Sequence, residues 1–285
     1  MPITLAGVMH KIDPPTLTFY RFFIAFLCLL PYLLLTGDIA PLAKLRRWRL
    51  TRKILFTGAM MALNYGFYIF ALARMSPSGA QVLIQLAPMM FLLAGVFIFD
   101  EYFSMRQWLG FAVFVVGLFT FFHLRISAML AGFDNYAIGM LLMLAAALFW
   151  VIYAIGQKQL LSSLGSIHLM MLINGIGTVA FLPFASPLQV TGLNAFELVL
   201  LFLCGLNTVI AYGAFTEALK HWQASRISAT LAIVPLLTLG FVQLNDYFDF
   251  IPLISEPLDA WVLLGAALVV IGAFTASMAN NRRAG

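Results

Sequence analysis

Amide and tyrosine side chains recur at four-residue spacing inside long apolar stretches of the chain. Asn64 and Tyr68 form one such pair, with Tyr65 beside Asn64, and Gln81 and Gln85 form another. Residues four apart share a helix face, so each pair can point in one direction. A polar side chain in the hydrocarbon region costs free energy unless a partner or a water-filled cavity receives it. These pairs therefore indicate the wall of a polar cavity.

The second half of the chain carries two further stripes, which add aromatic and hydroxyl groups. They consist of Trp150, Tyr153 and Gln157, and of Thr208, Tyr212 and Thr216. Together the four stripes predict a mixed polar and aromatic pocket that binds an amphipathic small-molecule solute. The alternative is that these side chains form interhelical hydrogen bonds and packing contacts, each worth about 0.6 kcal/mol.

Four other residues have special chemistry inside apolar stretches. Arg21 either extends its side chain to the outer surface or serves in gating or in binding a solute carboxylate. Pro88 and Pro235 interrupt backbone hydrogen bonds in mid-helix, which predicts hinges with free carbonyls, or static kinks. Glu217 lies one turn from the inner end of its span, where it is either a proton-coupling acid or an interface charge.

The composition is that of a polytopic membrane protein. Of 285 residues, 63% are hydrophobic and 9% are charged, whereas soluble domains are roughly a quarter charged. Six of the sixteen basic residues lie in KLRRWRLTRK, residues 44–53, which is typical of a cytoplasmic loop beside a span. We therefore expect contacts with membrane lipid and none with nucleic acid.

No sequence feature indicates an enzyme, a metal site or a cofactor. The chain has no HExxH or GxSxG motif and no phosphate-binding glycine loop. The four histidines fall on separate segments, and the two cysteines lie in apolar runs without metal-ligand spacing. The sequence makes no prediction of oligomeric state.

Windows of about twenty residues predict nine full-length helical spans. Their bounds are roughly 16–36, 54–73, 79–99, 107–123, 136–156, 167–187, 196–218, 227–244 and 260–279. If the loop at 37–53 is cytoplasmic, twelve Lys and Arg residues lie inside and three outside. This distribution predicts a cytoplasmic C-terminus.

An internal repeat relates the two halves of the chain. At an offset of 147 residues, Tyr65 and Pro88 align with Tyr212 and Pro235, and after eight extra residues the offset becomes 155 for the glycines of the last spans. Each complete repeat holds five spans, an odd number, so the two repeats have opposite orientations in the membrane. Inverted repeats are a common plan of secondary transporters, whose solute sites lie between the halves.

The same offset places the opening MPITLAGVMHKI on Leu148 to Gln159, the second half of a full span. A dozen helical residues cross only about 18 Å of a hydrocarbon core of about 30 Å. We therefore expect the opening to be the outer half of helix one, truncated at its start. The expectation is nine full spans plus this half helix.

The chain resembles the EamA-type transporters of the drug/metabolite transporter superfamily. The resemblance rests on the stretch from Ala71 to Phe121, ALARMSPSGAQVLIQLAPMMFLLAGVFIFDEYFSMRQWLGFAVFVVGLFTF. The family's mid-helix proline, acidic loop and glycine-rich last span correspond to Pro88, Glu101, Gly110 and Gly117, and in the second copy to Pro235, Asp246, Gly265 and Gly272. DPPTLTFYRF, residues 13–22, also resembles the family's second helix.

The resemblance implies an all-α membrane protein of two inverted five-helix repeats, at residues 1–125 and 136–285. It also implies a secondary transporter of the cell (inner or plasma) membrane, which exports small organic metabolites such as amino acids, or toxic compounds, by alternating access. One alternative is a truncated, inactive or partner-dependent membrane protein. A membrane-embedded enzyme is a weaker one.

Overall fold

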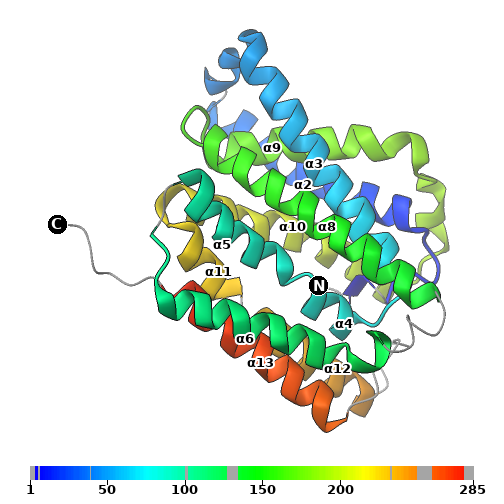
Figure 1. The fold of residues 1–285 in the computed structure, drawn as a ribbon. Coiled ribbons are helices and arrows are strands. Elements are labelled where there is room, and N and C mark those ends of the chain that lie inside the picture. Colours follow the sequence, from blue (N-terminus) through cyan, green and yellow to red (C-terminus); the bar gives the residue numbers. More distant parts are fainter. Residues whose placement is uncertain are drawn as a thin grey trace.

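The computed structural model describes residues 4–5, 7–38, 40–99, 102–126, 134–231, 233–248 and 259–278. Within these ranges the chain is helical and contains no strand (Figure 1). The α-helices are α2 (Pro14–Thr36), α3 (Trp48–Leu72), α4 (Pro77–Leu83), α5 (Leu86–Phe99), α6 (Met105–Phe121), α8 (Asn135–Leu160), α9 (Ser166–Phe181), α10 (Ala195–His221), α11 (Ala224–Leu231), α12 (Val234–Phe248) and α13 (Ala260–Ser277). Short 3-10 helices lie at η1 (Ala40–Arg46), η2 (Leu182–Phe184) and η3 (Pro187–Gly192).

Seven helical segments of the described chain are long and apolar enough to cross a bilayer, and each matches a predicted span. Two predicted spans remain. The span at 107–123 corresponds to α6, which has 17 residues, and the span at 227–244 is divided into α11 and α12. Large apolar side chains such as Leu35, Phe97 and Val179 are exposed on the helices, as lipid-facing surfaces require. The chain is therefore an all-α polytopic membrane protein.

Three features used in the sequence analysis fall outside the described residues. They are the acidic residue Glu101, the side chain of Asp246, and the C-terminal residues 279–285 with their two arginines. The orientation of the C-terminus accordingly stays a prediction.

Short polar side chains fix where several of the helices begin. Asp13 accepts a hydrogen bond from the Thr16 backbone N–H at 2.7 Å ahead of the Pro14-Pro15 pair, and α2 ends at Gly37, whose φ of 68° is left-handed. Ser104, Asp134 and Asp259 cap α6, α8 and α13 in the same way. These caps satisfy backbone donors that have no partner inside the helix.

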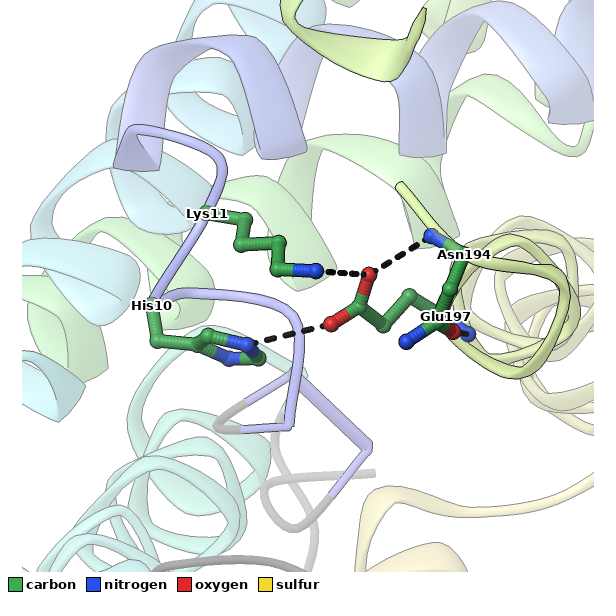
Figure 2. A network of polar contacts seen from close by, with 4 residues as sticks. All are labelled: His10, Lys11, Asn194 and Glu197. Carbon is green, nitrogen blue, oxygen red and sulfur yellow. Dashed lines mark hydrogen bonds and ion pairs between the residues drawn. The ribbon is translucent and has the colours of Figure 1, made fainter. Parts of the chain in front are cut away.

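The opening segment packs against α10. Its described residues form turns closed by hydrogen bonds such as that from the Ile12 N–H to the Val8 carbonyl. Figure 2 shows how it is attached, because Glu197 receives Lys11 Nζ at 3.0 Å on one carboxylate oxygen and His10 Nε2 at 3.1 Å on the other. Glu197 also completes a capping box with Asn194 at the start of α10.

The helices of the two repeats interleave. Residues of the two copies that are related by the offset are called counterparts below. α2 packs on α9, its counterpart helix, and also on α10, while α3 packs on α8 and α9. Gly58 of α3 faces Ile176 of α9, and the counterpart Gly205 of α10 faces Ile24 of α2. In Figure 1, α2, α3, α8, α9 and α10 gather on one side, and α4, α5, α6, α11, α12 and α13 on the other.

The pair α6 and α13, side by side in Figure 1, reveals the relation between the repeats. A Cβ added to Gly110 would lie 2.3 Å from the Ala276 backbone nitrogen, and one added to Gly265 would lie 2.3 Å from that of Phe121. Gly110 and Gly265 are counterparts at offset 155, and so are Phe121 and Ala276. Each contact is therefore the repeat image of the other.

The same holds for the remaining glycines of this seam. Gly117 faces Val269 and its counterpart Gly272 faces Phe114, which is itself the counterpart of Val269. Residues further along α6 meet residues earlier along α13, so the two helices are antiparallel. Counterpart helices that meet antiparallel in a self-complementary set of contacts are related by a local two-fold axis, as the inverted-repeat plan requires.

Candidate functional site

A cavity lies between the two repeats. Its volume of about 420 Å³ is within the range of small-molecule sites. Both groups of helices contribute to it, and most of the polar residues singled out from the sequence line it. The lining residues are Arg21, Asn64, Tyr65, Tyr68, Gln81, Ile84, Gln85, Ala87, Pro88, Trp150, Asn207, Ala211, Tyr212, Phe215, Leu231, Val234, Leu237, Thr238 and Phe241.

Arg21 is the one cation among these lining residues. Its side chain is 3% exposed, and its guanidinium carbon lies 4.2 Å from the centroid of the Tyr65 ring. The Nε atom has no hydrogen-bond partner, and no carboxylate of the described chain pairs with this arginine. The side chain is thus turned into the cavity and does not extend to the outer surface, which was the alternative.

Aromatic rings form much of the remaining wall. Tyr65 and its counterpart Tyr212 lie across the repeat interface with ring centroids 5.7 Å apart, and Trp150 lies 5.2 Å from Phe215. The buried Tyr65 hydroxyl has no well-formed hydrogen bond. The wall therefore offers apolar ring faces together with a buried hydroxyl group that has Arg21, Thr208 and Tyr212 as polar neighbours.

The cavity amides are partly occupied by the protein itself. Asn64 Nδ2 donates to the Ala146 carbonyl at 2.9 Å, and Gln85 Nε2 donates to the Leu231 carbonyl at 3.0 Å. Gln81, in contrast, makes no hydrogen bond in the described structure. The interhelical hydrogen bonds that were the alternative interpretation are thus present for Asn64 and Gln85.

The two prolines coincide with breaks in their helices. α4 ends at Leu83 and α5 begins at Leu86, which places the break at the residues just before Pro88. Proline has no N–H to donate to the carbonyl four residues earlier, and its ring crowds that carbonyl. For Pro235 that carbonyl belongs to Leu231, and Gln85 of the other repeat supplies the missing donor. The Ser228 hydroxyl likewise donates to the Pro88 carbonyl at 2.8 Å.

Five of the residues in the predicted stripes and coupling position, and the hinge Pro235, do not line the cavity. The Thr208 hydroxyl donates to the Cys204 carbonyl one turn back, and Thr216 donates to the Tyr212 carbonyl and accepts from Gln157. Hydroxyls in helices commonly bond to the carbonyl four residues earlier, which removes them from a cavity wall. Tyr153 is fully buried in packing.

Glu217 lies at the other end of α10 from Glu197, away from the cavity. Its side chain is 50% exposed, it accepts a hydrogen bond from Ser166, and it pairs with Lys220 and His221. This is the environment of an interface charge. The coupling role predicted for it stays a prediction.

The face of α10 that lines the cavity is shifted by one residue from the predicted stripe. Asn207, Ala211 and Phe215 lie on it at four-residue spacing, together with Tyr212. Asn207 was missed although an asparagine in an apolar span is itself a signal. Phe215 was identifiable as the counterpart of Tyr68. Within the described ranges, no group of His, Cys, Asp and Glu side chains could hold a metal ion.

Comparison with known proteins agrees with this architecture. The model of the EamA-like transporter family matches residues 1–122 and 137–278. The chain is 32% identical over 284 residues to the Escherichia coli protein named as an uncharacterized inner membrane transporter, YhbE, with 99% of this chain and 88% of that protein covered. An uncharacterized transporter of Haemophilus influenzae is also 32% identical, over 281 residues, with 99% and 91% covered.

Two further similarities are more distant. A Salmonella typhimurium protein named as a probable amino-acid metabolite efflux pump is 25% identical over 236 residues, covering 77% of this chain and 75% of that one. A solved crystal structure with 17% sequence identity superposes with a TM-score of 0.64 over 96% of this chain and 94% of the other, which shows the same fold. The family match spans nearly the whole chain and its function is transport rather than catalysis, so this membrane protein belongs to the EamA-like transporter family.

Proposed function

We propose that this transporter exports small organic solutes that carry a carboxylate, amino acids and related metabolites above all. The observation that carries the proposal is Arg21, a cation buried in the cavity wall that no carboxylate of the described residues pairs with. Burying an unpaired charge costs several kcal/mol, so such a group is retained where a ligand completes it. A carboxylate fits best, because guanidinium binds it through two parallel hydrogen bonds.

The rest of the wall supports an amphipathic solute. Trp150, Phe215 and the three tyrosines of the wall offer ring faces to an apolar side chain, and Gln81 offers an unoccupied amide. Aromatic faces also attract an ammonium group. An amino acid with an apolar side chain would place its carboxylate on Arg21, its ammonium group on a ring face and its side chain against the other rings. In addition, a distant relative is named as a probable amino-acid metabolite efflux pump.

We further propose that the repeats, residues 1–125 and 136–285, move against each other in alternating access. The broken helices α4–α5 and α11–α12 cross at the cavity and are joined by the hydrogen bonds of Gln85 and Ser228. At the breaks near Pro88 and Pro235 regular helical hydrogen bonds are already missing, so the backbone can bend there without breaking further ones. The distant relative named as a probable efflux pump supports export, and the distribution of basic residues supports a cytoplasmic C-terminus.

The test is counterflow in proteoliposomes, which needs neither a known coupling ion nor a known direction. Radiolabelled phenylalanine, methionine and leucine would each be compared with the corresponding decarboxylated amine. We expect label to accumulate for amino acids and not for amines. Arg21→Gln should reduce accumulation about tenfold or more, and Arg21→Lys should retain part of it, since a lysine keeps the charge but not the bidentate geometry.

Two results would overturn the proposal. Equal counterflow of the amines and the amino acids would show that the carboxylate is not recognised. Counterflow of no solute by a well-folded protein would favour the alternative of an inactive or partner-dependent chain.

A further inference from the structure

A second and larger pocket lies at one membrane surface, between the first turns of α3 and the end of α8. It has a volume of about 1290 Å³ and lies apart from the solute cavity, with which it shares no residue. Its floor is tight, because a Cβ at Gly156 of α8 would come within 2.6 Å of the Thr57 hydroxyl. Lys44 holds the neighbouring loop to the end of α8 by donating to the Ser163 carbonyl at 2.7 Å.

The pocket is strongly basic. Arg47, Arg49, Arg52 and Lys53 line it, and within the described part of the chain none of them is paired with a carboxylate. Arg49, Arg52 and Lys53 stand at three- and four-residue spacing, so they lie on one face of α3. Four unneutralised cations that converge on one concave surface form a site for an anion.

The wall changes from basic to apolar along α3. Trp48 is 69% exposed and Phe56 is 56% exposed, and both line the same pocket as the cations. Eight residues of helix separate them, a rise of about 12 Å, which carries the pocket from headgroup level toward the acyl chains. Ile152 of α8 adds to the apolar end and is 40% exposed.

We propose that this pocket binds an anionic phospholipid, phosphatidylglycerol or cardiolipin, with the phosphate among the cations and an acyl chain along the apolar wall. Basic pockets between membrane helices on the cytoplasmic side bind such headgroups, and the distribution of basic residues assigns this end of the bundle to that side. A free phosphate would use the cations alone and would leave the apolar wall without a partner.

The test is lipid retention by the full chain, measured by native mass spectrometry after addition of phosphatidylglycerol or phosphatidylcholine with identical acyl chains. The triple variant Arg49→Gln, Arg52→Gln, Lys53→Gln should retain phosphatidylglycerol about tenfold less. A control triple variant, Arg106→Gln, Lys220→Gln, Arg226→Gln, removes the same charge elsewhere and should retain the lipid normally. If both triple variants lose it equally, binding is diffuse electrostatics and the proposal fails.

A second measurement locates the lipid and does not depend on the triple variant. Phosphatidylglycerol brominated near the top of its acyl chains should quench tryptophan fluorescence in the parent protein, and less so in Trp48→Phe. Equal quenching in both would overturn the proposal. Complete displacement of the lipid by millimolar inorganic phosphate would instead identify a small-anion site, and would also overturn it.

Discussion

The two repeats have the same glycines at the α6–α13 seam but differ in several residues of the central cavity wall. In the seam, glycine faces backbone at four places, and the four contacts map onto one another through the repeat. In the cavity, Arg21, Asn64 and Tyr68 of the first repeat have His168, Ala211 and Phe215 as counterparts. The glycines are thus identical between the repeats where the two backbones touch, whereas these three positions of the cavity wall differ and only the Tyr65 and Tyr212 pair is kept there.

The pair Arg21 and His168 shows what this divergence does. Both side chains are buried, and both lie early in the second helix of their repeat. His168 Nε2 contacts the Asp38 carbonyl and lies 3.6 Å from the Asp38 carboxylate, whereas Arg21 has no anionic partner in the described chain. The His168 position is thus engaged by the protein through Nε2, although the buried Nδ1 has no hydrogen-bond partner. The Arg21 position is left open, which we attribute to the solute.

The largest effect is expected from the symmetric region. Gly272→Ala would place a Cβ 2.3 Å from the Phe114 backbone nitrogen, and backbone cannot yield as a flexible side chain can. Overpacking typically costs about 1–3 kcal/mol, and a clash with backbone belongs at the upper end of this range. We expect little folded protein by size-exclusion fluorescence of a tagged chain. The matched control is Gly213→Ala, a site with nothing within 4 Å, which should leave the profile unchanged.

The second prediction separates stability from transport at the counterparts Arg21 and His168. Arg21→Gln removes an unpaired buried charge, so it should raise the melting midpoint or leave it unchanged while counterflow falls about tenfold. His168→Gln removes the contacts with Asp38 and should cost about 1 kcal/mol, with little loss of counterflow in the remaining folded protein. A loss of stability in Arg21→Gln equal to that in His168→Gln would contradict the comparison.

The start of α10 is stabilised by side chains of the protein, whereas the start of α3 is not. α10 begins with the Asn194 and Glu197 capping box and the ion pairs of Figure 2, whereas Arg47 precedes α3 without any side-chain cap. Glu197→Gln should therefore lower the melting midpoint by about 2–4 °C. Glu217→Gln, a half-exposed carboxylate on the same helix, is the control and should change it less. A larger effect of the control would refute the role given to the cap.

The sequence was sufficient to predict the spans and the repeat, because apolar length and charge placement are local properties. The amides Asn64, Gln81 and Gln85, singled out by their spacing, lie in the cavity wall, whereas the sequence left Arg21 open between this wall and the outer surface. The helix face was harder to predict, since Thr208 and Thr216 share a stripe with Tyr212 but turn to their own helix carbonyls. The second lining stripe depends on how α10 is rotated by packing on α2, and the signals for it were the polar residue Asn207 and the repeat relation of Phe215 to Tyr68.

The smallest expected effect concerns the crossing of the broken helices. Gln85 donates to the Leu231 carbonyl that Pro235 leaves without a helical donor, so Gln85→Met should cost about 0.6 kcal/mol. Gln81→Met, which removes an amide without a hydrogen bond, is the control for lost cavity polarity.

The double-mutant cycle with Pro235→Ala decides whether this assignment of the bond is right. An alanine at 235 restores the backbone N–H that can donate to Leu231, so Gln85→Met should then cost nothing measurable. Thermal midpoints of the four proteins give the coupling. If Gln85→Met costs the same with proline and with alanine at 235, the glutamine does not replace the missing backbone donor. The crossing would then depend on packing and on the bond from the Ser228 hydroxyl to the Pro88 carbonyl, and Gln85 would not compensate for the break at Pro235.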